Sequence, residues 1–172
     1  MEIRQATSDD REDLLSLWEQ LDAHHRALAS TPKGHRLWSL GPQRAVQVTK
    51  RLDELLEKDL AAIFVAEEDG ELIGYIGGEV LVRPEGARPR IAGQILTAFV
   101  REDRRSRGIG TALVDAILSF FESNEVEEVT LRYVIANRLG ERFWQRLGFE
   151  PVICTANTRP DELRHKLNQL GR

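Results

Sequence analysis

Hydrophobic residues recur at helical spacing in four stretches of the chain. The first stretch follows Thr7, which stands three residues before Asp10 as in a capping box, and predicts a helix that ends at about Ala29. Pro42 suits the first turn of a second helix. A third helix is expected from residue 109 and a fourth over residues 137–147, closed by Gly148. The first helix has its apolar positions at Leu14, Leu17, Trp18, Leu21 and Leu28.

Between these helices the apolar pattern predicts strands. Asp69-Gly70 is a hairpin turn signal that joins two of them. The expected strands cover residues 2–6, 61–67, 71–83, 94–101, 129–134 and 149–155. An antiparallel meander followed by two strand–helix crossovers predicts an α/β fold, with a mixed central sheet of about six to seven strands flanked by helices.

Length and composition add limits to this picture. The chain has 172 residues, of which 41% are hydrophobic and 30% charged, and this predicts a single globular domain over 1–172 with a short terminal helix at about 160–170. It carries no apolar run of the ~18 residues that a membrane span needs. A polar N-terminus and the single residue Cys154, expected to be buried, favour a cytoplasmic protein. The formal net charge of −4 disfavours a nucleic-acid partner.

The most informative segment is the turn over residues 101–111, REDRRSRGIGT. A strand ends there, and Gly108-Ile109-Gly110 then opens an amphipathic helix. A helix N-terminus offers unpaired N–H groups and a positive dipole end, glycines let the backbone approach a bulky anion, and arginines add charge. Together these features predict a pyrophosphate site. The third glycine of a dinucleotide fingerprint is replaced by Leu113, and no Gly-Lys-Ser/Thr is present, so dinucleotide and nucleoside triphosphatase sites are disfavoured.

Three motifs resemble those of the GNAT family of N-acetyltransferases. Residues 105–110, RSRGIG, resemble its Gln/Arg-x-x-Gly-x-Gly/Ala motif, and residues 99–103, FVRED, resemble the approach to it. Asn137, Phe143-Trp144 and Leu147-Gly148-Phe149 look like the family's later helix. The element order also agrees, to about Val152.

The resemblance implies a binding site for acetyl-CoA, the co-substrate, between two parallel strands, and no metal. Backbone groups of Ala98, Phe99 and Val100 would pair with the pantetheine arm, and Asn137 would contact it from the later helix. Which of Arg104, Arg105 and Arg107 reaches the phosphates stays open. The pyrophosphate would lie on residues of one turn, namely Arg105, Ser106, Arg107, Gly108, Ile109, Gly110 and Thr111.

The implied chemistry is direct attack by a neutral primary amine on the thioester in a ternary complex, which calls for a general base or an ordered water and for an oxyanion donor. Many family members have a tyrosine as general acid where Trp144 stands, and an indole N–H cannot take that role at neutral pH. Trp144 would position the thioester or, equally well, pack as a core aromatic. Arg132 replaces a glutamate base of some protein-acetylating members and cannot act as a base.

The candidate bases are Glu79, on the strand meander, and three histidines, His24, His25 and His35. The acceptor pocket is expected at residues 24–41, with His25, His35 and Trp38 among its lining. The leading hypothesis is an N-acetyltransferase that acts on a small-molecule amine. The alternatives are a protein or peptide N-acetyltransferase and a catalytically weak CoA-binding regulatory module. Homodimerisation through the terminal helix that begins at Pro160 is a further hypothesis.

Overall fold

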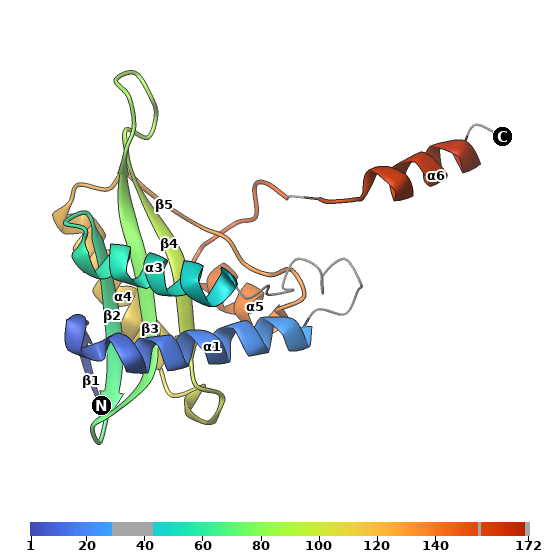
Figure 1. Cartoon of the computed structure of the whole chain (residues 1–172). Coiled ribbons are helices and arrows are strands. Elements are labelled where there is room, and N and C mark those ends of the chain that lie inside the picture. Colours follow the sequence, from blue (N-terminus) through green and yellow to red (C-terminus); the bar gives the residue numbers. More distant parts are fainter. Residues whose placement is uncertain (29–42, 155, 171–172) are drawn as a thin grey trace. The chain divides into compact units, whose positions relative to one another are not determined.

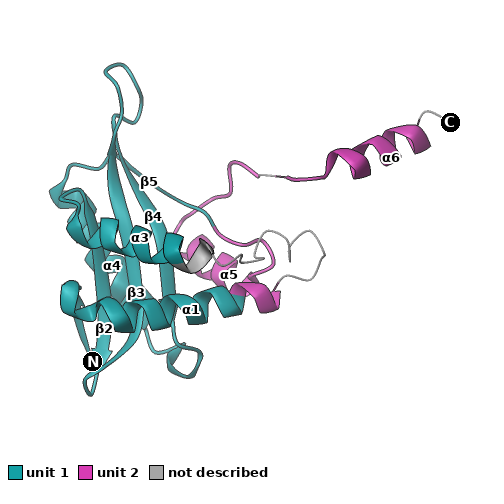
Figure 2. Cartoon of the chain, viewed as in Figure 1, with its two compact units in different colours: residues 1–24, 40–132 teal, residues 25–39, 133–172 magenta. Residues whose placement is uncertain are grey.

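A computed structural model describes residues 1–28, 43–154 and 156–170 (Figure 1). Its contacts divide the chain into two compact units, residues 1–24 with 40–132 and residues 25–39 with 133–172 (Figure 2). The helices are α1 Arg11–Leu28, α3 Gln43–Glu57, α4 Ile109–Ser123, α5 Arg138–Arg146 and α6 Pro160–Leu170. The strands are β1 Glu2–Gln5, β2 Ala61–Glu68, β3 Glu71–Val82, β4 Ile91–Val100 and β5 Glu128–Leu131, and short 3-10 turns lie at Ser8–Asp10 and Glu102–Arg104.

The first unit contains one mixed sheet in the order β1-β2-β3-β4-β5. The first four strands pair antiparallel and β4 pairs with β5 in parallel. The α/β fold is confirmed, whereas the expected count of six to seven strands is too high for the described residues, which form five. Residues 149–154 form no strand, and Val152 and Ile153 are each 89% exposed. Their side chains favour a strand locally, but a strand also needs a neighbouring edge, and no strand of the described chain pairs with this segment.

Helices cover both faces of the sheet in this unit. On one face, leucines of α1 and α3 pack against Ile63, Val65, Tyr75 and Phe99 in a single apolar cluster. On the other face, Phe121 of α4 lies directly on the backbone of β3 and β4. A Cβ built on Gly93 would lie 3.1 Å from its ring. The missing side chain therefore allows α4 to pack this closely.

The N-terminal turn is stabilised by a buried carboxylate. Asp10 is 7% exposed, accepts the backbone N–H of Thr7 at 2.8 Å, and receives both guanidinium NH groups of Arg4, at 2.7 and 2.8 Å. These hydrogen bonds, that of Arg4 first, hold the pKa of Asp10 below its ordinary value. The expected pairing of Thr7 with Asp10 is therefore present, although a 3-10 turn precedes the α-helix.

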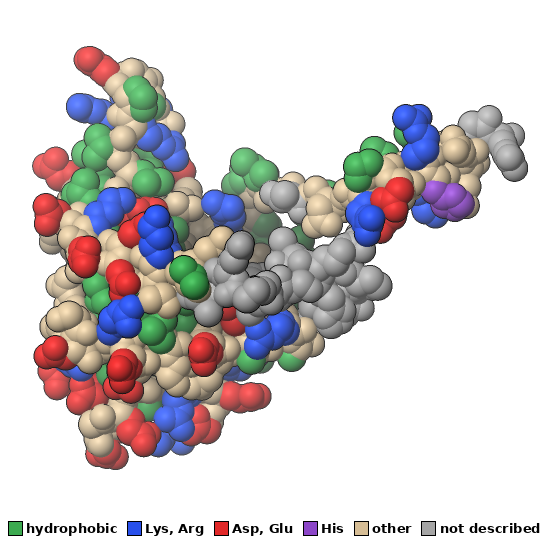
Figure 3. All heavy atoms as spheres, in the orientation of Figure 1, with side chains coloured by type: hydrophobic (Ala, Val, Ile, Leu, Met, Phe, Trp, Pro, Cys, Tyr) green, Lys and Arg blue, Asp and Glu red, His purple; other side chains and the backbone are tan. Residues whose placement is uncertain are grey.

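Charge is distributed without a single dominant sign over the visible face of α1 and α3, where acidic and basic side chains intermingle (Figure 3). The net charge of −4 therefore does not form one acidic surface there. Within the described ranges, no helix is both long and apolar enough to span a membrane.

The second unit contains α5 and α6. Trp144 is 8% exposed and packs edge-on against Phe143 and Phe149, with ring centroids 4.9 and 5.5 Å apart. Gly148 closes α5 with a φ of 88°, as the sequence predicts. Cys154, expected to be buried, is exposed, as are Val152 and Ile153 just before it. The helix α6 has no buried residue.

Candidate functional site

The last half of β4 has one open edge. β5 pairs with β4 only from Ala92 to Ile95, and after that point no strand of the described residues lies on this edge of β4, while β3 continues along the other edge. The N–H of Arg101 donates to Ile73 of β3 at 2.9 Å. Because backbone groups alternate in direction along a strand, those of Ala98 and Val100 are directed to the open edge. This edge can therefore accept an extended ligand as an additional strand would be accepted.

The turn after β4 presents backbone to the same region. Ser106 and Gly108 have positive φ values of 64° and 79°, and α4 begins at Ile109. A Cβ built on Gly108 would meet nothing within 4 Å, so open space borders the first turn of α4. The free N–H groups and dipole of a helix start, with no acidic residue in its first turn, suit an anion.

The arginines of this turn differ in their partners. Arg101 pairs with Glu71 at 3.1 Å and with Asp103 at 3.3 Å, and Arg104 pairs with Glu68 at 2.6 Å. These acids already neutralise the two guanidinium groups.

Arg105 and Arg107 make no ion pair with any described residue. The Nε of Arg105 donates to the Val100 carbonyl at 3.0 Å, and its guanidinium lies 5.8 Å from the centroid of the Phe99 ring. The sequence did not decide which of Arg104, Arg105 and Arg107 would bind the phosphates. Arg105 and Arg107 are the two whose positive charge is not already paired with a carboxylate.

His24 lies near this turn. Burial lowers its pKa, and the positive charge of Arg105 lowers it further against the opposing effect of Glu102. The imidazole is therefore held in its neutral form more strongly than that of an ordinary histidine. His24 of α1 thus lies within electrostatic range of the turn after β4.

A buried polar group that the sequence reasoning missed lies beside β4. The Tyr75 hydroxyl is hydrogen-bonded to the Thr97 hydroxyl at 3.0 Å, and both residues are buried. Asp22 of α1 is 6% exposed, and its charge adds to the effect of burial in raising the pKa of Tyr75. One signal pointed to Asp22: it follows Trp18 by four residues, at the margin of the apolar stripe of α1.

Glu79 does not lie at the open edge. It pairs in register with Gln94, four residues before Ala98, or roughly 13 Å along the strand. Its carboxylate accepts from Lys58 at 2.7 Å and from Arg51 at 2.8 Å. Burial raises the pKa of Glu79, but these two cations outweigh burial and the net pKa is lowered. A carboxylate held by two cations is a poor base, so the structure assigns Glu79 to the ion-pair network.

The remaining predicted residues lie elsewhere. Thr111 is exposed in the first turn of α4. Asn137, in the second unit, caps α5 by accepting the Gly140 N–H at 3.0 Å. His25 belongs to α1 and is half-buried, whereas His35 and Trp38 lie outside the described residues. The burial of Trp144 among aromatic rings agrees with the packing interpretation of that residue.

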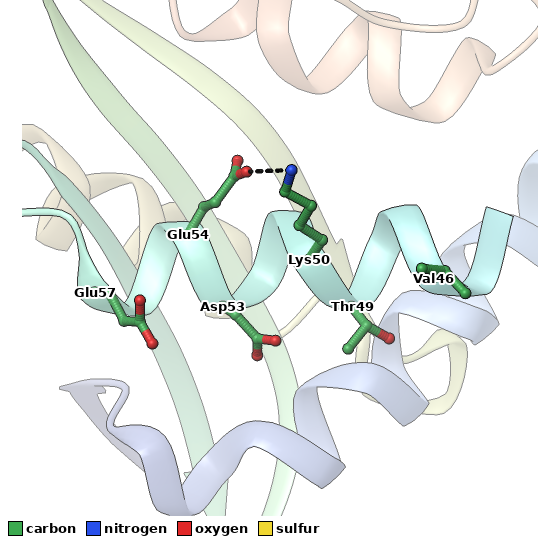
Figure 4. A pocket seen from close by; sticks show the side chains of 6 residues that line it. All are labelled: Val46, Thr49, Lys50, Asp53, Glu54 and Glu57. Atoms are coloured by element: carbon green, nitrogen blue, oxygen red, sulfur yellow. Dashed lines mark ion pairs between the residues drawn. The ribbon is translucent and has the colours of Figure 1, made fainter. Parts of the chain in front are cut away.

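A groove of about 590 Å³ runs beside α3 (Figure 4). All six lining side chains come from this one helix, and two of them, Lys50 and Glu54, form an ion pair at 3.9 Å. Three of these described lining side chains are the carboxylates of Asp53, Glu54 and Glu57, so the groove does not suit the predicted anion. Among the described side chains there is no group of three or more potential metal ligands.

Comparison with known proteins places this geometry in context. A family model described as the acetyltransferase (GNAT) family matches residues 18–149. An N-alpha-acetyltransferase of Sulfurisphaera tokodaii is 35% identical over 104 residues, which are 58% of this chain and 62% of that protein. A mycothiol acetyltransferase of Thermobispora bispora is 32% identical over 132 residues, which are 77% of this chain and 41% of that protein. The matches thus span less than two thirds of either relative.

Solved structures share the fold. The BH1408 protein of Bacillus halodurans, in a tetramutant form, superposes on this chain with a TM-score of 0.75 at 21% sequence identity. The superposition covers 92% of this chain and 99% of the BH1408 chain. The aminoglycoside N-acetyltransferase AAC(6')-Iy in complex with CoA gives a TM-score of 0.68 at 21% identity, over 92% and 98% of the two chains.

Proposed function

Because this chain belongs to the acetyltransferase (GNAT) family, we propose that it transfers the acetyl group of acetyl-CoA to a primary amine of a small molecule. The observation that carries the proposal is the open edge of β4 leading into a helix N-terminus. An extended arm pairs with Ala98 and Val100, and its phosphates then meet the turn at residues 105–110. The same order of strand edge and anion site matches the order of pantetheine and pyrophosphate in the co-substrate.

The residues of this chain then have separate tasks. Backbone groups of Ala98 and Val100 bind the arm, whereas those of Phe99, which the resemblance also implied, are directed to β3. The N–H groups of residues 105–111, with Arg105 and Arg107, bind the phosphates. From the motif resemblance alone, the proposal gives Asn137 a contact with the co-substrate arm and Trp144 a role in positioning the thioester, within one domain over residues 1–172.

The reaction forms a bond between the amine nitrogen and the acetyl carbon and breaks the carbon–sulfur bond of the thioester. A backbone N–H at the open edge, from Ala98 or Val100, stabilises the oxyanion. The thiolate takes its proton from water or from the attacking nitrogen, because the indole of Trp144 is not an acid at neutral pH.

A small-molecule acceptor is the substrate class that we favour. Arg132 is exposed and stands where some protein-acetylating members have a glutamate base, so it cannot take that role. Among the proteins compared, AAC(6')-Iy is an aminoglycoside acetyltransferase and the Thermobispora relative a mycothiol acetyltransferase. The second candidate is a protein N-terminal acetyltransferase, which the name of the Sulfurisphaera relative favours.

Two measurements test the proposal. Calorimetry with acetyl-CoA should give a saturable complex, and release of free thiol should then follow addition of tyramine, 1,4-diaminobutane or kanamycin. Thiol release with an N-terminal peptide alone would replace the small-molecule class by the protein class. Binding without release on any acceptor would favour the regulatory module, and failure to bind acetyl-CoA would refute the assignment of the site.

The proposal includes a homodimer through α6. The exposed leucines of this helix, Leu163, Leu167 and Leu170, recur at intervals of four and three residues and form one apolar stripe. A helix of 11 residues is marginal by itself in water, so a partner helix would stabilise it. The equivalent stripe of a second copy supplies such a partner.

A further inference from the structure

Two hydroxyl groups in the core of the first unit form a pair with an unused hydrogen. The oxygens of the Tyr75 and Thr97 hydroxyls lie 3.0 Å apart, a distance at which either can be the donor. Each hydroxyl carries one hydrogen, so the bond between them uses one of the two. Within the described residues, neither hydroxyl has another hydrogen-bond partner. Because a buried O–H group without an acceptor is costly, the second hydrogen calls for a ligand.

The burial of the two residues decides which hydroxyl carries the unused hydrogen. Tyr75 is fully buried, whereas Thr97 is 7% exposed and directly precedes Ala98 at the open edge of β4. Burial raises the pKa of Tyr75 against the lowering effect of its bond to Thr97, so the phenol keeps its hydrogen. Tyr75 therefore donates that hydrogen to Thr97, and the Thr97 hydroxyl can donate its own outward.

A β-bulge places Thr97 at the point where the edge of the sheet opens. The register between β3 and β4 shifts by one residue there, because Leu96 has no partner between Ile95 and Thr97. The pairing of β4 with β5 ends at the same place. A Cβ built on Gly77 would lie 3.2 Å from the methyl group of Thr97 and 3.4 Å from a side chain of the core cluster. Thr97 thus lies on the face that α1 and α3 cover.

The thioester end of acetyl-CoA has to leave the plane of the sheet at this bulge. An arm that pairs with Ala98 and Val100 cannot continue along β4, because β5 occupies the edge before the bulge. The face toward α4 is closed, since a Cβ built on Gly78 would lie 2.9 Å from the Phe121 ring. The acyl group is therefore directed to the other face, on the side of the Thr97 hydroxyl.

We propose that the Thr97 hydroxyl donates a hydrogen bond to the carbonyl oxygen of the thioester and stabilises the oxyanion together with a backbone N–H of the open edge. This inference rests on the proposed acetyl transfer and adds a catalytic residue to it. Tyr75 is the positioning residue, because its O–H fixes the orientation of the Thr97 hydroxyl. The same hydrogen bond polarises that hydroxyl and makes it a better donor.

The Thr97 hydroxyl keeps its proton throughout the reaction. As the amine nitrogen bonds to the acetyl carbon, an electron pair of the carbonyl double bond moves to oxygen, and the hydrogen bond from Thr97 becomes charge-assisted. The electron pair returns when the carbon–sulfur bond breaks. Because the donor binds the anionic oxygen more strongly than the neutral carbonyl, it raises kcat more than it tightens the binding of acetyl-CoA.

The first test is Thr97→Val, which removes the hydroxyl and keeps the branched shape. We expect kcat to fall about 100-fold, the low end for loss of one oxyanion donor, with the Kd of acetyl-CoA within about threefold of the wild type. Thr97→Ser keeps a hydroxyl and should restore most of the kcat. Thr130→Val is the matched control, because the Thr130 hydroxyl already donates to the Gly93 carbonyl at 3.3 Å, and its kcat should stay within about threefold of the wild type.

The double variant Thr97→Val/Tyr75→Phe separates catalysis from packing. Thr97→Val alone leaves the buried Tyr75 hydroxyl without its partner and should lower the melting temperature, whereas removal of both hydroxyls relieves that cost. We expect the double variant to recover the melting temperature but not kcat. Recovery of both would mean that the pair has only a structural role and would overturn the proposal. If Thr97→Val does not fold, the double variant replaces it in every measurement.

An infrared measurement tests the contact without turnover. In acetyl-CoA isotopically labelled at the carbonyl carbon, the carbonyl stretch should shift to lower frequency on binding to the wild type, because a hydrogen bond weakens the carbon–oxygen double bond. The shift should be smaller in the double variant and unchanged in Thr130→Val. Equal shifts in the wild type and the double variant would refute the contact with Thr97.

The outcomes separate this proposal from the proposed function. Normal turnover by a folded Thr97→Val variant overturns the role of Thr97 and leaves acetyl transfer intact. A carbonyl shift that depends on Thr97, without thiol release on any acceptor, supports the contact and refutes the proposed transfer. Failure of the wild type to bind acetyl-CoA refutes both.

Discussion

The Nε of Arg105 donates a 3.0 Å hydrogen bond to the carbonyl oxygen of Val100, which joins the turn before α4 to the last residue of β4. The guanidinium also lies over the Phe99 ring. One side chain therefore connects the strand edge proposed for the pantetheine arm with the turn proposed for the phosphates. This connection makes the turn the first target for substitution.

Gly108→Ala should weaken acetyl-CoA binding at least tenfold. The new Cβ would enter the open space at the start of α4, and the φ of 79° would add about 1 kcal/mol of backbone strain. Gly70→Ala is the matched control, because Gly70 has a φ of 80° and equally open surroundings in the hairpin turn. Calorimetry should show a loss of affinity for the Gly108 variant alone. Equal affinities for the two variants would contradict the placement of the phosphates.

Arg105→Gln and Arg107→Gln should each weaken acetyl-CoA by about tenfold, the lower end of what a charge-assisted hydrogen bond contributes. Arg104→Gln serves as control, since Glu68 already neutralises that side chain. Measured Kd values should depend less steeply on salt in the two sensitive variants than in the wild type. A larger loss in Arg104→Gln than in the other two would reverse our assignment.

Glu79→Gln should destabilise the fold by about 1–3 kcal/mol, because two partly exposed cations lose their buried partner. The folded-state pKa of Glu79 is lowered, so its contribution to stability is present above pH ~4.5 and is lost as pH falls through the folded value. In denaturant titrations, the free energy of unfolding of the variant should be lower than that of the wild type at pH 7, and this difference should be much smaller at pH 3.5. A hundredfold loss of kcat in a folded variant would instead support the catalytic role predicted from the sequence.

His24→Gln should reduce the loss of stability on mild acidification. The lowered folded-state pKa of His24 means that the unfolded chain binds the proton more readily, so neutral His24 stabilises the fold above pH ~6.5 and this contribution is lost as pH falls through the folded value. Melting temperatures at pH 7.5 and 5.5 should differ less in the variant than in the wild type. Equal changes of melting temperature in the variant and the wild type would contradict this role of His24.

The double variant Leu163→Gln/Leu167→Gln should be monomeric if α6 forms the dimer contact. Light scattering should give twice the chain mass of 19.6 kDa for the wild type and the single chain mass for the variant. The exchange His165→Gln lies off the apolar stripe and should leave the mass unchanged. A monomeric wild type would reject the dimer.

Local chemistry explains which predictions from the sequence succeeded. Positive φ at Asp69 and Gly70 and the start of α4 after Gly108 depend on a few adjacent residues, so short patterns were sufficient. The strand expected at 149–155 is absent over the described residues 149–154, since strand formation depends on a neighbouring edge that apolar character does not reveal. The partners of Glu79 were also invisible, because Arg51 and Lys58 are 28 and 21 residues away.

The sequence by itself determined the α/β class, the order of most elements and the glycine-bearing turn with its arginines, because periodicity, turn chemistry and a short motif are local properties. Only the tertiary structure decided which arginines keep an uncompensated charge, that Glu79 is an ion-pair partner, and that the Tyr75 and Thr97 hydroxyls meet in the core. Those outcomes depend on the burial and charge of groups that folding brings together from distant parts of the chain, and electrostatic interactions follow distance in space rather than separation in sequence.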